Sequence, residues 1–181
     1  NIDEWLDALR MEQLASLNFV YADKDDNIFF VHNAKSPVRV PNYNWKQVVP
    51  GNKSELIWTD FHPFESVPQI LNPSSGYIFS TNQNPFFVTA KEDNLSLSNF
   101  NPTMGFQTRT TNRAYRAYEL LDADKSISFS ELDKYKHDNK FSYNSRQYKF
   151  MEEIFNHEFS EYKLKNAQKF LRDWDLGTDT N

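Results

Sequence analysis

The stretch "LNFVYADKDDNIFFVH", residues 17–32, decides the fold of the first half of the chain. Apolar and aromatic residues fill two short runs, Asn18–Ala22 and Ile28–His32, and the polar segment "DKDDN" separates them. Runs of this kind on either side of a short turn are typical of an antiparallel hairpin. We therefore expect two paired strands here, and an α+β fold whose antiparallel strands lie in the first half.

A helical period marks four other segments of the chain. Apolar residues recur at intervals of three and four in residues 2–16, from Asn112 to Leu121, in residues 146–157 and in residues 161–174. Residues 91–112 have no such period and are predicted to form a long surface loop. We treat residues 1–181 as one fragment, with a strand-rich part over 1–90 and a helical part over 112–176.

The segment "DADKSISFSELD", residues 122–133, has some features of a calcium-binding loop. The odd-numbered ligand places of such a loop hold Asp122, Asp124, Ser126 and Ser128. However, Ile127 stands where the sharp turn needs glycine, and Asp133 stands where a bidentate glutamate is needed. We favour a junction between two helices, with Ser128 and Glu131 forming a capping box and the second helix reaching about His137.

Composition narrows the classes of function. The net charge of −5 argues against general nucleic-acid binding, and no apolar run is long enough to cross a membrane. There are no cysteines, so disulfides and thiolate metal sites are excluded. The four histidines show no metal-ligand spacing, and we expect them to be structural or on the surface. The chain starts at Asn1 and carries no signal peptide, so we expect both ends to be cuts within a longer polypeptide.

A second informative stretch is "NPSSGYIFSTNQNPFF", residues 72–87. Its centre, Gly76–Thr81, is predicted to be a buried strand that ends on three amide side chains, Asn82, Gln83 and Asn84. Pro85 restricts the preceding residue to an extended conformation and stiffens the exit. An asparagine held at a strand end can aim its N–H at a developing oxyanion. From the residues alone, however, we favour a structural turn rich in turn-forming residues, with the oxyanion role as the alternative.

Neither a nucleophile nor a phosphate loop is recognisable in these residues. No Ser, Thr or Cys stands in a nucleophile-elbow or Cys/His context. With four glycines in total, a phosphate-cradling glycine loop is excluded. If the chain is part of an enzyme, we therefore expect its nucleophile to lie outside these residues.

Several motifs taken in order resemble one family. They are "LNFVYADKDDNIFFVH", "PVR", "VVPG", "HPFESVPQILNPSSGYIFSTNQNP", "TNRAYRAYELLDADKSISFSEL" and "LRDWD". From about Trp5 to Asp175, their order and spacing resemble the penicillin acylase family of N-terminal nucleophile hydrolases. The resemblance implies part of an αββα sandwich and an internal fragment of the large (beta) subunit. In that family a precursor cleaves itself, and the new N-terminal serine attacks an amide with its own α-amino group as base.

The same resemblance implies a function. We expect an amidohydrolase that cleaves linear amides such as β-lactam side chains, N-acyl homoserine lactones or lipopeptide acyl groups, hence a role in antibiotic metabolism or quorum quenching. Its partners would be the remainder of the same precursor and a small-molecule amide, and its location would be periplasmic or secreted. The isolated fragment should be inactive. The alternative is a non-catalytic interaction module or a degenerate acylase relative.

The resemblance also implies two catalytic residues. The family's oxyanion-hole asparagine, in the Gly-Tyr-Ile…Asn-x-x-Pro segment, corresponds to Asn82. The family's arginine, which orients that asparagine and the catalytic amine, corresponds to Arg113, with Arg109 and Arg116 as alternatives in register. Gln83 and Asn84 are left with structural roles.

Further site residues follow by the same comparison. Leu17, just before the Asn-x-x-Tyr-Ala-Asp motif, corresponds to a residue that lines the acyl pocket, and Asn18 follows it as a second substrate-binding candidate. No cofactor is required for the chemistry. Many members bind a structural calcium, and Asp93 is the nearest match to one carboxylate ligand. A family proline that offers a carbonyl to that ion is replaced near Trp45, and the family's glycine in the hairpin turn is Asp26 here.

Overall fold

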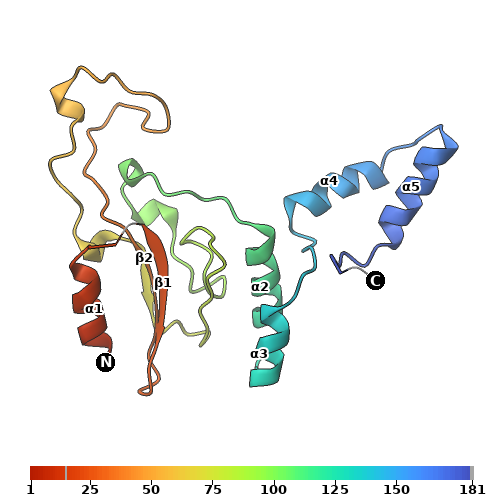
Figure 1. Cartoon of the computed structure of the whole chain (residues 1–181), viewed down its shortest axis with the longest axis horizontal. Coiled ribbons are helices and arrows are strands. Elements are labelled where there is room, and N and C mark those ends of the chain that lie inside the picture. Colours follow the sequence, from red (N-terminus) through yellow and green to blue (C-terminus); the bar gives the residue numbers. More distant parts are fainter. Residues whose placement is uncertain (15, 180–181) are drawn as a thin grey trace. The chain divides into compact units, whose positions relative to one another are not determined.

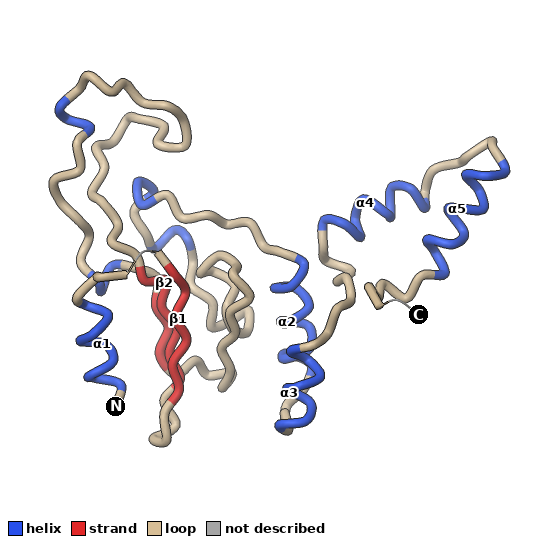
Figure 2. The backbone as a smooth tube through the Cα atoms, viewed as in Figure 1, coloured by secondary structure: helices blue, strands red, loops and turns tan. Residues whose placement is uncertain are grey.

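The computed structural model describes residues 1–14 and 16–179. The chain divides into two compact units, Asn1–Arg109 and Thr110–Asn181, which are described separately below. In chain order the elements are α1 (Ile2–Arg10), β1 (Leu17–Ala22), β2 (Ile28–Asn33), β3 (Gln69–Leu71), α2 (Asn112–Ala123), α3 (Phe129–Lys136), α4 (Arg146–Phe155) and α5 (Tyr162–Asp173) (Figures 1 and 2). Within the described residues these are three antiparallel strands and five α-helices, which confirms the α+β class.

The predicted hairpin is confirmed. β1 and β2 pair antiparallel, with Asn18 opposite His32 and Ala22 opposite Ile28. In the turn, the Asp23 carboxylate accepts hydrogen bonds from the backbone and side-chain N–H groups of Asn27, which lower the pKa of Asp23 to about 2. Asp26 adopts a φ of 62°, in the left-handed region that glycine occupies most easily. This explains why the related motif has glycine at that place.

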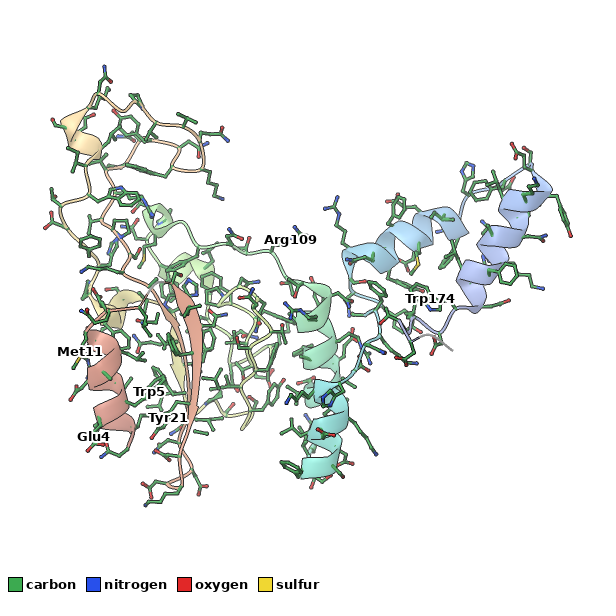
Figure 3. The ribbon with its side chains drawn as sticks, viewed as in Figure 1. Glu4, Trp5, Met11, Tyr21, Arg109 and Trp174 are labelled. Carbon is green, nitrogen blue, oxygen red and sulfur yellow. The ribbon has the colours of Figure 1, made fainter. Side chains whose placement is uncertain are left out.

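One face of the hairpin packs against α1. The ring of Trp5 on α1 contacts those of Phe19, Tyr21 and Phe29, with centroids 6.4, 5.0 and 5.7 Å away. Figure 3 shows Trp5 and Tyr21 side by side in this layer. Because side chains alternate along a strand, Phe30 of β2 points the other way. It is fully buried in a second cluster with Ile70 and Val88, so β2 is covered on both faces.

Helix α1 is shorter than the predicted residues 2–16. It begins with a capping box between Asn1 and Glu4, and it ends at Arg10. Glu12 then takes a φ of 50°, a left-handed conformation that stops a helix. Residue 15, also within the predicted range, lies outside the described residues.

The predicted strand Gly76–Thr81 is wrong. The segment is not part of a sheet, and the Phe79 N–H donates to the Val88 carbonyl at 2.9 Å, an isolated contact rather than a ladder. The side chain of Gln83 bonds the backbone of Phe79 and Thr81 instead. The third strand is β3, which pairs with β2 in a region that the sequence pattern did not mark as a strand.

The predicted surface loop over 91–112 contains no strand and two short 3-10 helices, Leu97–Asn99 and Pro102–Met104, and an α-helix starts only at Asn112. It is nevertheless not confined to the surface. Met104 is buried in the cluster under α1, and Phe100 and Phe106 pack against that cluster. Three apolar side chains therefore anchor a segment that lacks any periodic pattern.

In the second unit, the helix junction preferred for residues 122–133 is confirmed. Ser128 caps α3 and forms the predicted capping box with Glu131. Helices α4 and α5 also form, although Phe150 and Phe170, on their predicted apolar stripes, are 62% and 79% exposed. Among the described residues, no helix is both long and apolar enough to cross a membrane.

Candidate functional site

Asn82 occupies a turn in the left-handed region, with a φ of 65°. Asparagine is one of the few residues besides glycine that adopt this conformation readily. Its side chain is exposed, and the described residues provide no hydrogen-bond partner for it. The amide N–H groups are therefore available to a bound molecule.

Gln83 holds the chain on both sides of this turn. Its side chain is 6% exposed, and its Nε2 donates to the carbonyls of Phe79 and Phe87 at 3.2 and 2.9 Å. Its Oε1 accepts from the backbone N–H of Thr81. One amide thus closes the loop around Asn82 in place of a strand ladder, which confirms the structural role expected for Gln83.

Asn84 and Pro85 fix the exit of the turn. The Asn84 Oδ1 accepts from the backbone N–H of Phe86 at 2.9 Å, and its Nδ2 donates to the carbonyl of Thr108 at 3.1 Å. Pro85 is fully buried. A side chain that bonds the backbone two residues on is a common turn device, so the structural role expected for Asn84 is confirmed as well.

The two substrate-binding candidates lie at the start of β1. Leu17 is 52% exposed. Asn18 faces inward: its Nδ2 donates to the carbonyl of Gln83 at 3.0 Å, and its Oδ1 lies 2.7 Å from Nδ1 of His32. Contact of Leu17 and Asn18 with substrate stays a prediction, but Asn18 is brought next to the Asn82 turn.

The three arginine candidates differ in their surroundings. Arg113 is exposed in the first turn of α2, and Arg109 is exposed at the end of the first unit (Figure 3). Arg116 instead binds Asp138 with Nε and Nη2 and binds Glu119 with Nη1. The bonds to Asp138 raise the pKa of Arg116. Asn82 belongs to the first unit and Arg113 to the second, so their pairing stays a prediction.

Asp93, the calcium candidate, is used within the loop. Its Oδ1 accepts from the hydroxyl of Ser74 at 2.7 Å, and its Oδ2 accepts from the backbone N–H of Ser75 at 2.8 Å. These bonds, that from Ser74 first, lower the pKa of Asp93. Within residues 1–14 and 16–179, no three His, Asp or Glu side chains are grouped so that they could hold a metal ion. Whether Asp93 binds calcium stays a prediction.

His32 and Gln83 are the residues near the site to which sequence reasoning gave no specific partners. The hairpin register gives the signal for His32, because strands over 18–22 and 28–32 place it directly opposite Asn18. His32 is partly buried, which lowers its pKa, and its ring packs edge-on against Phe106. No sequence rule gives the partners of Gln83, since they depend on how the loop folds back.

A separate hollow of about 280 Å³ lies beside Arg39. Its lining is aromatic and basic, with Arg39, Tyr43, Asn44, Trp45, Lys46, Pro102, Thr103, Met104 and Gly105. The Arg39 Nη1 already donates to the carbonyls of Thr103 and Met104 at 2.6 and 3.0 Å, and its guanidinium stacks on Trp58. Arg39 therefore links its own segment to the backbone of Thr103 and Met104 and to the ring of Trp58.

Comparisons with known proteins agree with the motif order. A sequence model described as penicillin amidase matches residues 1–181, the whole chain. Penicillin G acylase from Escherichia coli is 35% identical over 85 residues, which are 47% of this chain and 10% of that protein. Thermostable penicillin G acylase from Alcaligenes faecalis has a similar structure, with a TM-score of 0.69 and 22% identity.

The structural match covers 99% of this chain and 31% of the Alcaligenes protein. The chain thus spans less than a third of the length of either relative. The likeness confirms the expected fold, an α+β part of the penicillin acylase architecture. Because the family's sequence model matches from the first residue to the last, the chain belongs to the penicillin amidase family.

Proposed function

We propose that this chain is part of an acylase that hydrolyses linear amides, with Asn82 as an oxyanion donor. The reaction would use an N-terminal serine outside these residues. The observation that carries the proposal is the state of Asn82, whose exposed amide has no partner among the described residues. The turn around it is braced by Gln83 and Asn84.

Such an arrangement suits transition-state stabilisation. When the serine oxygen adds to the amide carbonyl, negative charge develops on the carbonyl oxygen, and a donor fixed beforehand stabilises it without reorganising. The serine's own amine takes the hydroxyl proton and passes it to the departing amine as the C–N bond breaks. Water then attacks the acyl-enzyme and releases the acid. Asn82 would donate its Nδ2–H to the oxyanion in both steps.

The arginine in this proposal is Arg113. The guanidinium of Arg116 is committed to Asp138 and Glu119, and it would have to leave two partly buried carboxylates to act elsewhere. The exposed guanidinium of Arg113 has no such constraint, and an arginine presents a rigid fork of donors that can hold an amide oxygen. Arg113 would orient Asn82 and the catalytic amine.

The substrate classes we propose are β-lactam side chains, N-acyl homoserine lactones and lipopeptide acyl groups. The partners are the remainder of the precursor, released by its own processing, and the amide itself. A periplasmic or secreted location fits this assignment. A structural calcium is also proposed, with Asp93 as one carboxylate ligand; the bonds from Ser74 and Ser75 would hold that carboxylate in place.

The test is an activity panel on the full-length, processed protein. We expect release of an amine from at least one of phenylacetyl amides, phenoxyacetyl amides or N-acyl homoserine lactones, and none from the 181-residue chain alone. A full-length protein with an N-terminal serine that cleaves none of them would contradict the proposal. A residue other than Ser, Thr or Cys at the processing site would favour the non-catalytic module.

A further inference from the structure

The hydrogen bonds of Asn18 belong to a series in which each group donates to the next, and the series ends beside Asn82. The Gln83 carbonyl oxygen can only accept, so the group of Asn18 that lies 3.0 Å from it must be the N–H donor. The opposite end of the amide, Oδ1, is then the atom that lies 2.7 Å from His32 Nδ1. An acceptor at this distance requires the proton of His32 to be on Nδ1.

The other ring nitrogen of His32 completes the chain. In a neutral imidazole with its proton on Nδ1, Nε2 is an acceptor. The Ser16 hydroxyl lies 3.3 Å from Nε2 and can donate to it. Burial lowers the pKa of His32, which favours the neutral ring. The order of donation is therefore Ser16 to His32, His32 to Asn18, and Asn18 to the main chain of Gln83.

This series of hydrogen bonds ends at the backbone next to the proposed oxyanion donor, Asn82. The N–H of Thr81, before Asn82, is held by the Gln83 side chain, and the C=O of Gln83, after Asn82, is held by Asn18. The sheet contributes a rigid base, because Asn18 and His32 are directly paired across β1 and β2. The orientation of the Asn82 turn thus depends on two side chains that belong to the hairpin.

We propose that Asn18 and His32 are positioning residues that hold Asn82 in the geometry needed for oxyanion stabilisation. This inference rests on the proposed function of Asn82. Neither residue needs to touch the substrate, since their effect is transmitted through the main chain of Gln83. A displacement of about 1 Å at a reacting centre can cost on the order of 100-fold in rate.

The test uses Asn18→Leu in the full-length, processed protein. Leucine has a similar size but no donor for the Gln83 carbonyl, so we expect kcat to fall roughly 10- to 100-fold, with KM within about twofold. Asn27→Leu is the matched control, because Asn27 is a partly buried asparagine at the opposite end of the same hairpin. Its amide donates to Asp23 in the turn and accepts from the Asn72 side chain, away from Gln83, so its loss should affect stability and leave kcat unchanged.

A double-mutant cycle separates positioning from general destabilisation. If Asn18 acts through Asn82, adding Asn18→Leu to Asn82→Gly should lower kcat less than about threefold further. If Asn18→Leu lowers kcat by the same factor in the wild type and in Asn82→Gly, the inference is overturned. Unchanged kcat in Asn18→Leu, with kcat lost in Asn82→Gly, would overturn this inference alone. Unchanged kcat in Asn82→Gly would overturn the proposed function and this inference together.

His32 gives a second comparison should Asn18→Leu fail to fold. His32→Phe keeps a ring against Phe106 but has no donor for Asn18, whereas His32→Asn places an N–H near the position of Nδ1. We expect His32→Phe to lower kcat about tenfold or more and His32→Asn to restore most of that loss. Equal kcat in the two variants would contradict the role of the Nδ1 proton.

Discussion

Replacing Gln83 with leucine tests whether one side chain closes the loop around Asn82. Leucine fills a similar volume but makes no hydrogen bond. In Gln83→Leu the carbonyls of Phe79 and Phe87 and the N–H of Thr81 would all lose their bond to this side chain. Because the side chain is 6% exposed, water would not replace these bonds without the loop opening.

The size of the effect follows from those three groups. An unsatisfied buried polar group costs about 1–3 kcal/mol, and partial relaxation keeps the sum below the simple total. We therefore expect the free energy of opening this loop to fall by about 3 kcal/mol. Since about 1.4 kcal/mol corresponds to a factor of ten, amide hydrogen exchange in the loop should accelerate roughly a hundredfold.

The assay is hydrogen exchange followed by mass spectrometry on peptides covering residues 77–88 of the full-length protein. Gln168→Leu is the matched control. The Gln168 Nε2 donates to the carbonyls of Ile154, Phe155 and His157 at 2.7, 3.2 and 2.9 Å, in the second unit.

Gln168→Leu should accelerate amide hydrogen exchange in the segment that connects α4 and α5 and leave exchange in residues 77–88 unchanged. If Gln83→Leu changes exchange in its own loop less than about threefold, the loop is held by other contacts and our reasoning on Gln83 is wrong.

Two further predictions concern charged groups. Arg116→Leu should lower the free energy of unfolding, measured by urea denaturation, by about 2 kcal/mol, because it leaves the carboxylates of Asp138 and Glu119 partly buried without their cation. Arg116→Lys should recover less than half of that loss. An unchanged free energy of unfolding in Arg116→Leu would contradict a stabilising role for these ion pairs. The pKa of Asp23 is about 2 in the folded protein and about 4 in the unfolded chain. The ionised carboxylate therefore stabilises the fold at pH values above about 4, and this contribution is lost as the pH falls toward 2. The difference in melting temperature between wild type and Asp23→Asn should therefore shrink between pH 5 and pH 2.5; a constant difference would contradict it.

Local signals predicted the hairpin and the helices well. The residues that define them are close in sequence: Asp23 and Asn27 make the turn, and Ser128 and Glu131 cap α3. The strand Gly76–Thr81 was wrong because an apolar run does not reveal whether its backbone bonds go to a neighbouring strand or to a side chain. β3 was missed because three residues are too few to show an alternating pattern.

The site was predictable to a different extent. Asn82 followed from the resemblance, and its left-handed φ agrees with an asparagine at that place. Its supports could not be found in the same way, because the bond from Asn18 to the Gln83 carbonyl joins residues 65 positions apart. Such a contact depends on how the loop of residues 72–95 packs on the hairpin, which no local pattern records.

The central claim is that the side chain of Asn82 stabilises an oxyanion, and Asn82→Gly in the full-length, processed protein tests it most directly. Glycine adopts the φ of 65° without strain, so this change removes the amide and keeps the backbone. Asn42→Gly is the matched control, since Asn42 is also exposed and has a φ of 70°. We predict that Asn82→Gly lowers kcat about 100- to 1000-fold with little change in melting temperature, while Asn42→Gly leaves kcat unchanged. A kcat for Asn82→Gly within about threefold of wild type would contradict the claim.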